Sequence, residues 1–187
     1  MNVFVLCSGR SASVTFTRAC QHIDNYTAGH ETKTSLLGPA RLDFPDFHIE
    51  ADNRLSWMLG RLGKKYGKQA FYVHLRRDYE ATARSYNLRW DYPGSIIRAY
   101  TEGILMARKR RGLQYCLDYV ETVNQNIEYF LRDKPKQMTV DLENIHQDFE
   151  EFWHRIGAEG DLQAALREWD TRYNQSRKRN LFAKIFQ

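Results

Sequence analysis

A short polar loop with one cation follows the first hydrophobic segment of the chain. The stretch VLCSGRSASVTF at residues 5–16 passes from apolar residues to small hydroxyl residues around Arg10, and a helical pattern then begins. Backbone N–H groups at a helix N-terminus bind phosphate or sulfate, and small residues let the anion approach. Arg10 adds a planar, permanently charged group that suits oxyanions. The loop therefore predicts an anion site; the alternative is that Gly9 turns the chain and Ser8 or Ser11 caps the helix.

A second group of polar residues follows a later hydrophobic segment. In YVHLRRDYEATARSYNLRW, residues 72–90, Arg76 and Arg77 end a predicted strand, and Ser85 comes eight residues after Arg77. If residues 78–88 are helical, Ser85 lies about two turns along the helix, so a guanidinium and a hydroxyl can bind one phosphate. The alternative is a pair of solvated arginines and an ordinary helix serine.

Regular elements must bring these two segments together. Four apolar segments are typical of strands: 2–7, 47–51, 70–75 and 137–142. Helical patterns lie between and after them, at 13–23, 53–67, 78–90, 95–111, 114–132 and 144–157. This alternation predicts an α/β three-layer sandwich, a parallel sheet of about four to five strands with helices on both faces. Ligands of such sheets bind at the carboxyl ends of the strands, so both polar segments should lie at that edge.

Two common nucleotide-binding motifs are absent from the first loop. The P-loop pattern needs a Gly-Lys-Ser/Thr step, which does not follow Gly9, and the dinucleotide pattern GxGxxG needs more than this one glycine. Together, however, the two segments resemble the PAPS-dependent sulfotransferases. In that family a [PG]-[KR]-S-[GA]-[ST]-[ST] loop holds the 5′-phosphosulfate of the donor, and an Arg-(x)7-Ser pair holds its 3′-phosphate. This chain reads Gly9-Arg10-Ser11-Ala12-Ser13-Val14 and Arg77-(x)7-Ser85.

The resemblance covers most of residues 1–157, because the segment 138–157 is similar to a later strand and helix of the family. It implies one sulfotransferase-like domain over 1–187 with a P-loop NTPase-like α/β fold. It also implies the donor PAPS (3′-phosphoadenosine 5′-phosphosulfate), with no metal. The acceptor would be a hydroxyl of a carbohydrate, glycolipid or small metabolite. The implied cofactor-binding residues are Gly9, Arg10, Ser11, Ala12, Ser13, Val14, Thr15, Arg77, Ser85 and Arg177. Ala12 departs from the family's usual glycine, and Val14 replaces a hydroxyl residue unless Thr15 takes over.

The chemistry implied by the resemblance needs a general base and charge stabilisation on the departing phosphate. Arg10 is expected to stabilise the leaving oxygen. Many carbohydrate sulfotransferases place a catalytic glutamate shortly after the first helix, which points to Glu31, whose pKa burial would have to raise. His30 beside it could be base or acceptor contact. His48 is the second base candidate, because some cytosolic members use a histidine near the corresponding strand.

Other residues near the predicted edge have more than one interpretation. Trp90 and Tyr92 sit in a predicted loop and are candidate acceptor-binding residues. His48, Glu50 and Asp52 alternate along one face of a strand end, which is a poor zinc pattern without a fourth partner, so a hydrogen-bonded strand end is expected there.

The composition bounds the compartment and the partners. The 187 residues carry a net charge of +5, with basic clusters at 107–112 and 176–180. The three cysteines form no metal pattern or disulfide framework, and neither a basic leader nor an apolar run of membrane-spanning length is seen. We therefore expect a cytoplasmic protein without a transmembrane segment. Two further classes stay open: a P-loop-like phosphotransferase, and a non-catalytic module that binds polyanions, although RNA-binding motifs are absent.

Overall fold

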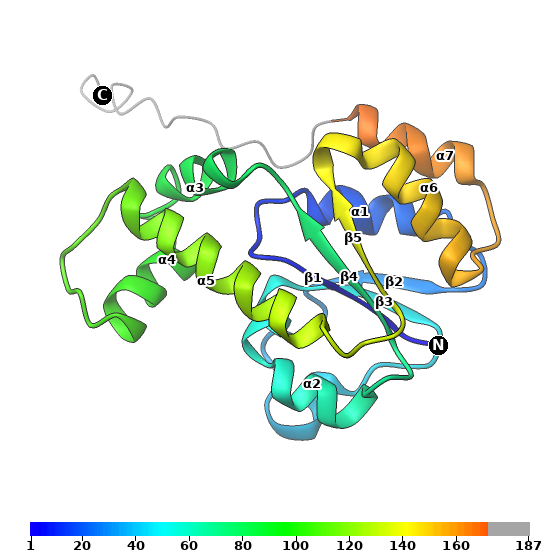
Figure 1. The fold of residues 1–187 in the computed structure, drawn as a ribbon, viewed down its shortest axis with the longest axis horizontal. Helices are drawn as coiled ribbons and strands as arrows, with labels where there is room; N and C mark the ends of the chain where they lie inside the picture. Colours follow the sequence, from blue (N-terminus) through cyan, green and yellow to red (C-terminus); the bar gives the residue numbers. More distant parts are fainter. Residues whose placement is uncertain (172–187) are drawn as a thin grey trace, which may run out of the picture.

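The computed structural model describes residues 1–171 and is built around a parallel sheet (Figure 1). Its five strands are β1 (Val3–Leu6), β2 (Thr27–His30), β3 (His48–Ala51), β4 (Phe71–Arg76) and β5 (Gln137–Asp141). They are arranged in the order β2-β3-β1-β4-β5, and every neighbouring pair is parallel. The predicted parallel α/β fold is thus confirmed for the described residues.

The register of the sheet places the strand ends at one edge. Ala51, the last residue of β3, pairs with Val5 of β1 and with His30, the last residue of β2. On the other side of β1, Leu6 pairs with His74 of β4. The loops that follow β1, β2 and β3 therefore begin at nearly the same level, as the ends of parallel strands do.

Helices cover both faces of the sheet, in three layers (Figure 1). On one face lie α1 (Ser13–Cys20), α6 (Ile145–Ile156) and α7 (Leu162–Arg167). On the other lie α2 (Leu59–Tyr66), α3 (Tyr79–Asn87), α4 (Ile96–Ala99) and α5 (Leu113–Leu131). The alternation of β1 follows from this: Val3 and Val5 pack in the first core, while Phe4 and Leu6 pack in the second. Each fully buried side chain of this size contributes about 1.5–3 kcal/mol.

Several predicted elements differ from the observed ones. The segment 53–67 is not one helix, because a 3₁₀ turn η2 (Asn53–Trp57) precedes α2. The predicted helix 95–111 ends early as well: α4 leads into a π-helical turn η3 (Tyr100–Ile104) and then into an irregular loop. Strand β2 and helix α7 were not predicted. β2 is a short edge strand in which Thr27 is exposed, so no apolar run marks it.

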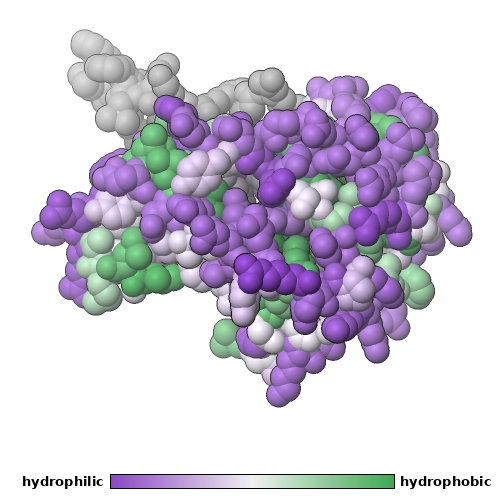
Figure 2. Space-filling view, viewed as in Figure 1, coloured by the Kyte–Doolittle hydropathy of each residue, from purple (hydrophilic) through white to green (hydrophobic). Residues whose placement is uncertain are grey.

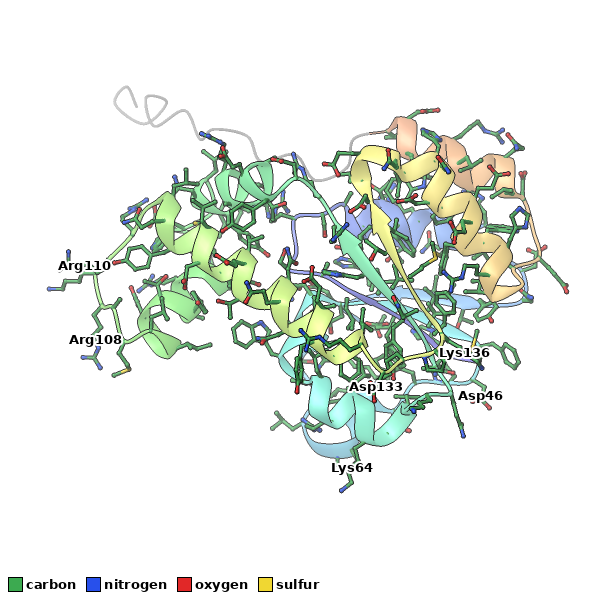
Figure 3. All side chains as sticks on the ribbon, in the orientation of Figure 1. Asp46, Lys64, Arg108, Arg110, Asp133 and Lys136 are labelled. Atoms are coloured by element: carbon green, nitrogen blue, oxygen red, sulfur yellow. The ribbon has the colours of Figure 1, made fainter. Side chains whose placement is uncertain are left out.

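The surface seen in Figure 2 is mostly hydrophilic. The charged side chain of Lys64, for example, extends away from the ribbon (Figure 3). None of the helices within residues 1–171 has the length and apolar content needed to cross a bilayer.

Candidate functional site

The loop between β1 and α1 has an unusual backbone. Gly9, Arg10 and Ala12 all have positive φ angles, of 89°, 61° and 63°. Positive φ angles are uncommon at non-glycine residues such as Arg10 and Ala12, and backbone strain of this kind clusters at ligand-binding sites. Arg10 and Ala12 each carry a conformational cost of about 1–2 kcal/mol there. A glycine at position 12 would adopt this angle without that cost.

Glycine is required at position 9 for a further reason. A Cβ atom added to Gly9 would lie 2.1 Å from the hydroxyl oxygen of Tyr86. That hydroxyl donates a hydrogen bond of 2.6 Å to the carbonyl of Ser8, and the hydroxyl of Tyr119 donates another of 2.9 Å to the same oxygen. Two tyrosine side chains of the second core therefore fix the loop through the carbonyl of Ser8.

The helix that follows the loop is not capped by a side chain. Ala12 occupies the N-cap position of α1, and no side chain accepts a hydrogen bond from the first turn. The alternative in which Ser8 or Ser11 caps the helix is wrong. The N-terminal N–H groups of α1 are left without that partner, as an anion-binding helix end requires.

Ser11 has an unsatisfied hydroxyl. Its side chain is buried, with 1% exposure, and its Oγ has no hydrogen-bond partner among the described residues. The neighbouring Cys7 thiol, which stays protonated because burial raises its pKa to about 11, is at most a weak hydrogen-bonding group for this hydroxyl. A buried hydroxyl without a strong partner is costly, which makes Ser11 a candidate ligand-binding residue.

The two polar segments found in the sequence meet in space. The Nε of Arg10 donates a hydrogen bond of 3.0 Å to the Oγ of Ser85, and Nη1 of Arg77 donates one of 3.2 Å to the carbonyl of Arg10. Burial lowers the pKa of Arg10, and the charges of Arg89 and Arg77 lower it further. The structure therefore gathers several cations around the loop, and the predicted proximity is confirmed.

Arg76 and Arg77 have different roles although they are adjacent. The guanidinium of Arg76 makes two hydrogen bonds to the carboxylate of Asp141, from Nε at 2.8 Å and from Nη2 at 2.9 Å. This bidentate pair joins β4 to β5 and raises the pKa of Arg76. Arg77 instead turns toward the β1–α1 loop, so only one of the two arginines reaches the candidate site.

His30 also reaches the loop. It ends β2, and its Nε2 lies 3.0 Å from the Oγ of Ser13, the first residue of α1. Glu31 follows with a positive φ of 53°, and its carboxylate forms an ion pair of 2.7 Å with Arg54. Of these two base candidates, His30 is the one in contact with the start of α1.

His48 lies elsewhere. It begins β3, at the amino end of that strand, and both ring nitrogens have partners: Thr27 Oγ1 at 2.8 Å and Glu50 Oε2 at 3.0 Å. Glu50 also accepts two hydrogen bonds of 2.7 Å from Thr32. Burial by itself raises the pKa of Glu50, but these hydrogen bonds outweigh it and the pKa is lowered. The structure does not bring His48 to the loop, and the expected hydrogen-bonded strand end is confirmed.

Asp52, the third polar residue predicted to share a strand face with His48 and Glu50, also has hydrogen-bond partners within the fold. It accepts a hydrogen bond of 2.8 Å from the backbone N–H of Arg54, as the N-cap of η2, and forms a buried ion pair with Arg41. Burial raises the pKa of Asp52 despite these partners. Arg41 was not singled out from the sequence, because nothing near it marks a buried arginine. Residues 1–171 contain no cluster of three or more side chains able to hold a metal.

The remaining predicted residues are placed as follows. Trp90 is 5% exposed and packs edge-on against Tyr115 in the second core, so its ring offers no face to an acceptor. Its predicted acceptor-binding role is therefore not supported. Tyr92 is exposed and lies under the guanidinium of Arg89. Val14 and Thr15 form the first turn of α1. Arg177 lies outside the described residues.

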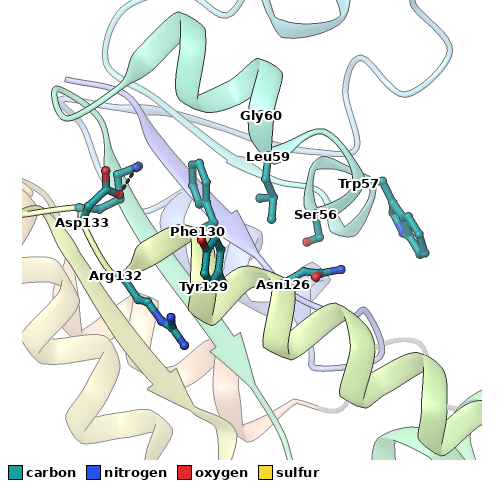
Figure 4. Close-up of a pocket in the computed structure, with 10 residues that line it drawn as sticks. Ser56, Trp57, Leu59, Gly60, Asn126, Tyr129, Phe130, Arg132 and Asp133 are labelled. Carbon is teal, nitrogen blue, oxygen red and sulfur yellow. Dashed lines mark hydrogen bonds and ion pairs between the residues drawn. The ribbon is translucent and has the colours of Figure 1, made fainter.

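A groove that was not predicted runs between η2–α2 and the C-terminal half of α5 (Figure 4). It has a volume of about 720 Å³. Ser56 and Trp57, which is 38% exposed, line it together with residues of α5. The hydroxyl of Ser56 donates to the carbonyl of Cys7, which connects this part of the groove to the residue that follows β1.

Comparison with family models, with curated proteins and with solved structures found no match.

Proposed function

We propose that this chain is a PAPS-dependent sulfotransferase whose donor nucleotide binds between the β1–α1 loop and the start of α3. One observation carries the proposal: Arg10 contacts Ser85, and Arg77 contacts the carbonyl of Arg10. Two anion-binding elements that are about seventy residues apart in the chain thus lie one beside the other. A nucleotide with phosphate groups on both its 5′ and 3′ positions needs two such elements.

Each element has a defined role in this proposal. The backbone N–H groups of the loop, with the hydroxyls of Ser11 and Ser13, bind the 5′-phosphosulfate. The bound anion would supply the partner that the Ser11 hydroxyl lacks. Arg77 and Ser85 bind the 3′-phosphate through charge-assisted hydrogen bonds. Arg10 exchanges its contact with Ser85 for the phosphate and stabilises the charge that forms there.

The reaction is an in-line transfer. The acceptor oxygen attacks sulfur, the bond from sulfur to the 5′-phosphate oxygen breaks, and its electron pair stays on 3′-phosphoadenosine 5′-phosphate. The acceptor proton passes to a base, which we assign to His30: with hydrogen on Nδ1, its Nε2 is an acceptor already placed 3.0 Å from Ser13. Glu31 is the second candidate, but it must first leave Arg54. As in phosphoryl transfer, positioning and electrostatics supply most of the rate.

The acceptor side of the proposal is coarser. A hydroxyl of a carbohydrate, glycolipid or small metabolite would approach next to the loop, where the exposed ring of Trp57 offers a stacking face. All three cysteines are free and buried, which fits a cytoplasmic location.

Nucleotide preference tests this function against the phosphotransferase alternative. We expect 3′-phosphoadenosine 5′-phosphate to bind at least about tenfold more tightly than ADP, because only the former can engage Arg77 and Ser85. Isothermal titration with both nucleotides measures the difference. Equal affinity, or a preference for ADP with magnesium, would favour a phosphotransferase and reject the proposed donor.

A further inference from the structure

A loop at one end of the molecule combines exposed apolar and basic side chains. We call residues 104–111 the ILM–RKRR loop, after its sequence ILMARKRR. Ile104, Leu105 and Met106 are 56%, 41% and 68% exposed. Figure 2 shows hydrophobic side chains at this end of the molecule, and the side chains of Arg108 and Arg110 extend outward from it in Figure 3. The proposed nucleotide site makes no use of this loop.

Backbone hydrogen bonds join the loop to the turn η3 that precedes it. Backbone N–H groups of Leu105 and Ala107 donate to the carbonyls of Tyr100 and Thr101, both at 2.9 Å, at the end of the π-helical turn η3. Met106 and Lys109 have positive φ angles of 55° and 62°. Such strain persists only where the surrounding structure fixes it, and π-helical turns are frequent at functional sites. The apolar tip is thus held outward instead of folding back onto the core.

The basic half of the loop has few internal partners. Arg111 pairs with Asp91 at 3.4 Å and lies over the ring of Trp90, which anchors it. The other three cations, Arg108, Lys109 and Arg110, form no ion pair within residues 1–171. Their charges are therefore available to an external anionic partner.

We propose that the ILM–RKRR loop docks the protein on an anionic lipid surface. Three exposed apolar side chains can enter the interface between headgroups and acyl chains, while the adjacent cations contact anionic headgroups. Stable peripheral binding needs two signals of this kind, and here they are consecutive in the chain. A nucleic acid or an acidic polysaccharide would match the cations but would leave the apolar residues in water.

Vesicle co-sedimentation tests the proposal on the full chain. The protein should bind vesicles that contain phosphatidylserine, and should not bind vesicles of phosphatidylcholine alone. The triple variant R108Q/K109Q/R110Q should lose about 100-fold in affinity, at roughly fivefold for each cation. The variant I104S/M106S keeps the charge and should lose about tenfold or more. As a matched control, K64Q/K68Q/K136Q removes three exposed cations elsewhere and should bind as the wild type does.

Three outcomes would overturn the proposal. Equal binding to both kinds of vesicle, or an equal loss in the control and loop triple variants, would remove the role of this loop. Binding of single-stranded RNA or heparin that needs the cations but is unchanged in I104S/M106S, without vesicle binding, would assign the loop to a polyanion. Titration of 3′-phosphoadenosine 5′-phosphate on the same variants should be unchanged, so the donor site is tested separately.

Discussion

Two polar clusters in the same sheet differ in how completely their hydrogen bonds are made. In β3, the side chains of His48 and Glu50 hydrogen-bond to each other, to Thr27 and to Thr32. At the carboxyl end of β1, the loop has positive φ angles at non-glycine residues and a buried hydroxyl without a partner. Both clusters are rich in residues that could do chemistry. The hydrogen bonds of the first cluster stabilise the fold, whereas the strain and the unsatisfied hydroxyl of the second are the features from which we propose a ligand site.

This difference separates the effects that substitutions should have. A change in the satisfied cluster should alter the free energy of unfolding and leave ligand affinity unchanged. A change in the loop should alter affinity or turnover while stability is kept.

The largest expected effect is on catalysis. His30→Gln removes the proposed base but keeps a side chain that can hydrogen-bond to Ser13, so turnover of PAPS should fall about 10²–10⁴-fold with nucleotide affinity unchanged. Rates of sulfate transfer or release, measured beside a titration, check both parts. Glu31→Gln is the comparison: a loss of that size in this variant, with His30→Gln active, would move the base role to Glu31.

The next effect is on stability. Glu50→Gln replaces a buried carboxylate that hydrogen-bonds to His48 and Thr32 by an amide, and we expect a loss of about 1–3 kcal/mol in the free energy of unfolding at neutral pH. Nucleotide affinity should not change, since Glu50 lies on the other cluster. Chemical denaturation and titration measure the two quantities, and weaker nucleotide binding with unchanged stability would contradict the structural role.

The same variant has a pH signature. The pKa of Glu50 is lowered below its ordinary value of 4.5, so its contribution to stability is present above that pH and is lost as the pH falls through the folded-state pKa. The gap in stability between wild type and Glu50→Gln should therefore shrink in acid. A gap independent of pH would show that the charge of Glu50 has no part in it.

The smallest effect is at the unsatisfied hydroxyl. Ser11→Ala removes a buried polar atom that has no partner, so the stability of the free protein should stay the same or rise by up to about 1 kcal/mol. Affinity for 3′-phosphoadenosine 5′-phosphate should fall by up to about tenfold, the value of one hydrogen bond. Lower stability together with unchanged affinity would place Ser11 among the structural residues.

The sequence predicts the fold where hydrophobic runs are long and the site where a motif is local. The apolar runs of β1 and β4 predict buried strands. The eight-residue spacing of Arg77 and Ser85, which marks them as a candidate pair, can be read from the sequence itself. β2 was not predicted, because an exposed edge strand needs little apolar surface. Without β2, there was no reason to expect His30 beside Ser13. The separation of His48 from the loop depends on the register of β3 in the sheet, which no short segment encodes. The groove lined by Ser56 likewise depends on how η2–α2 packs against α5.

The central claim is that the β1–α1 loop and the start of α3 hold one doubly phosphorylated nucleotide. Calorimetric titration of 3′-phosphoadenosine 5′-phosphate on wild type, Arg77→Ala and Arg76→Ala tests it most directly, because the two arginines are adjacent and only Arg77 contacts the loop. We predict a loss of about 1.5–3 kcal/mol in binding free energy for Arg77→Ala and little change for Arg76→Ala. Equal binding by all three proteins, or no binding by the wild type, would contradict the claim.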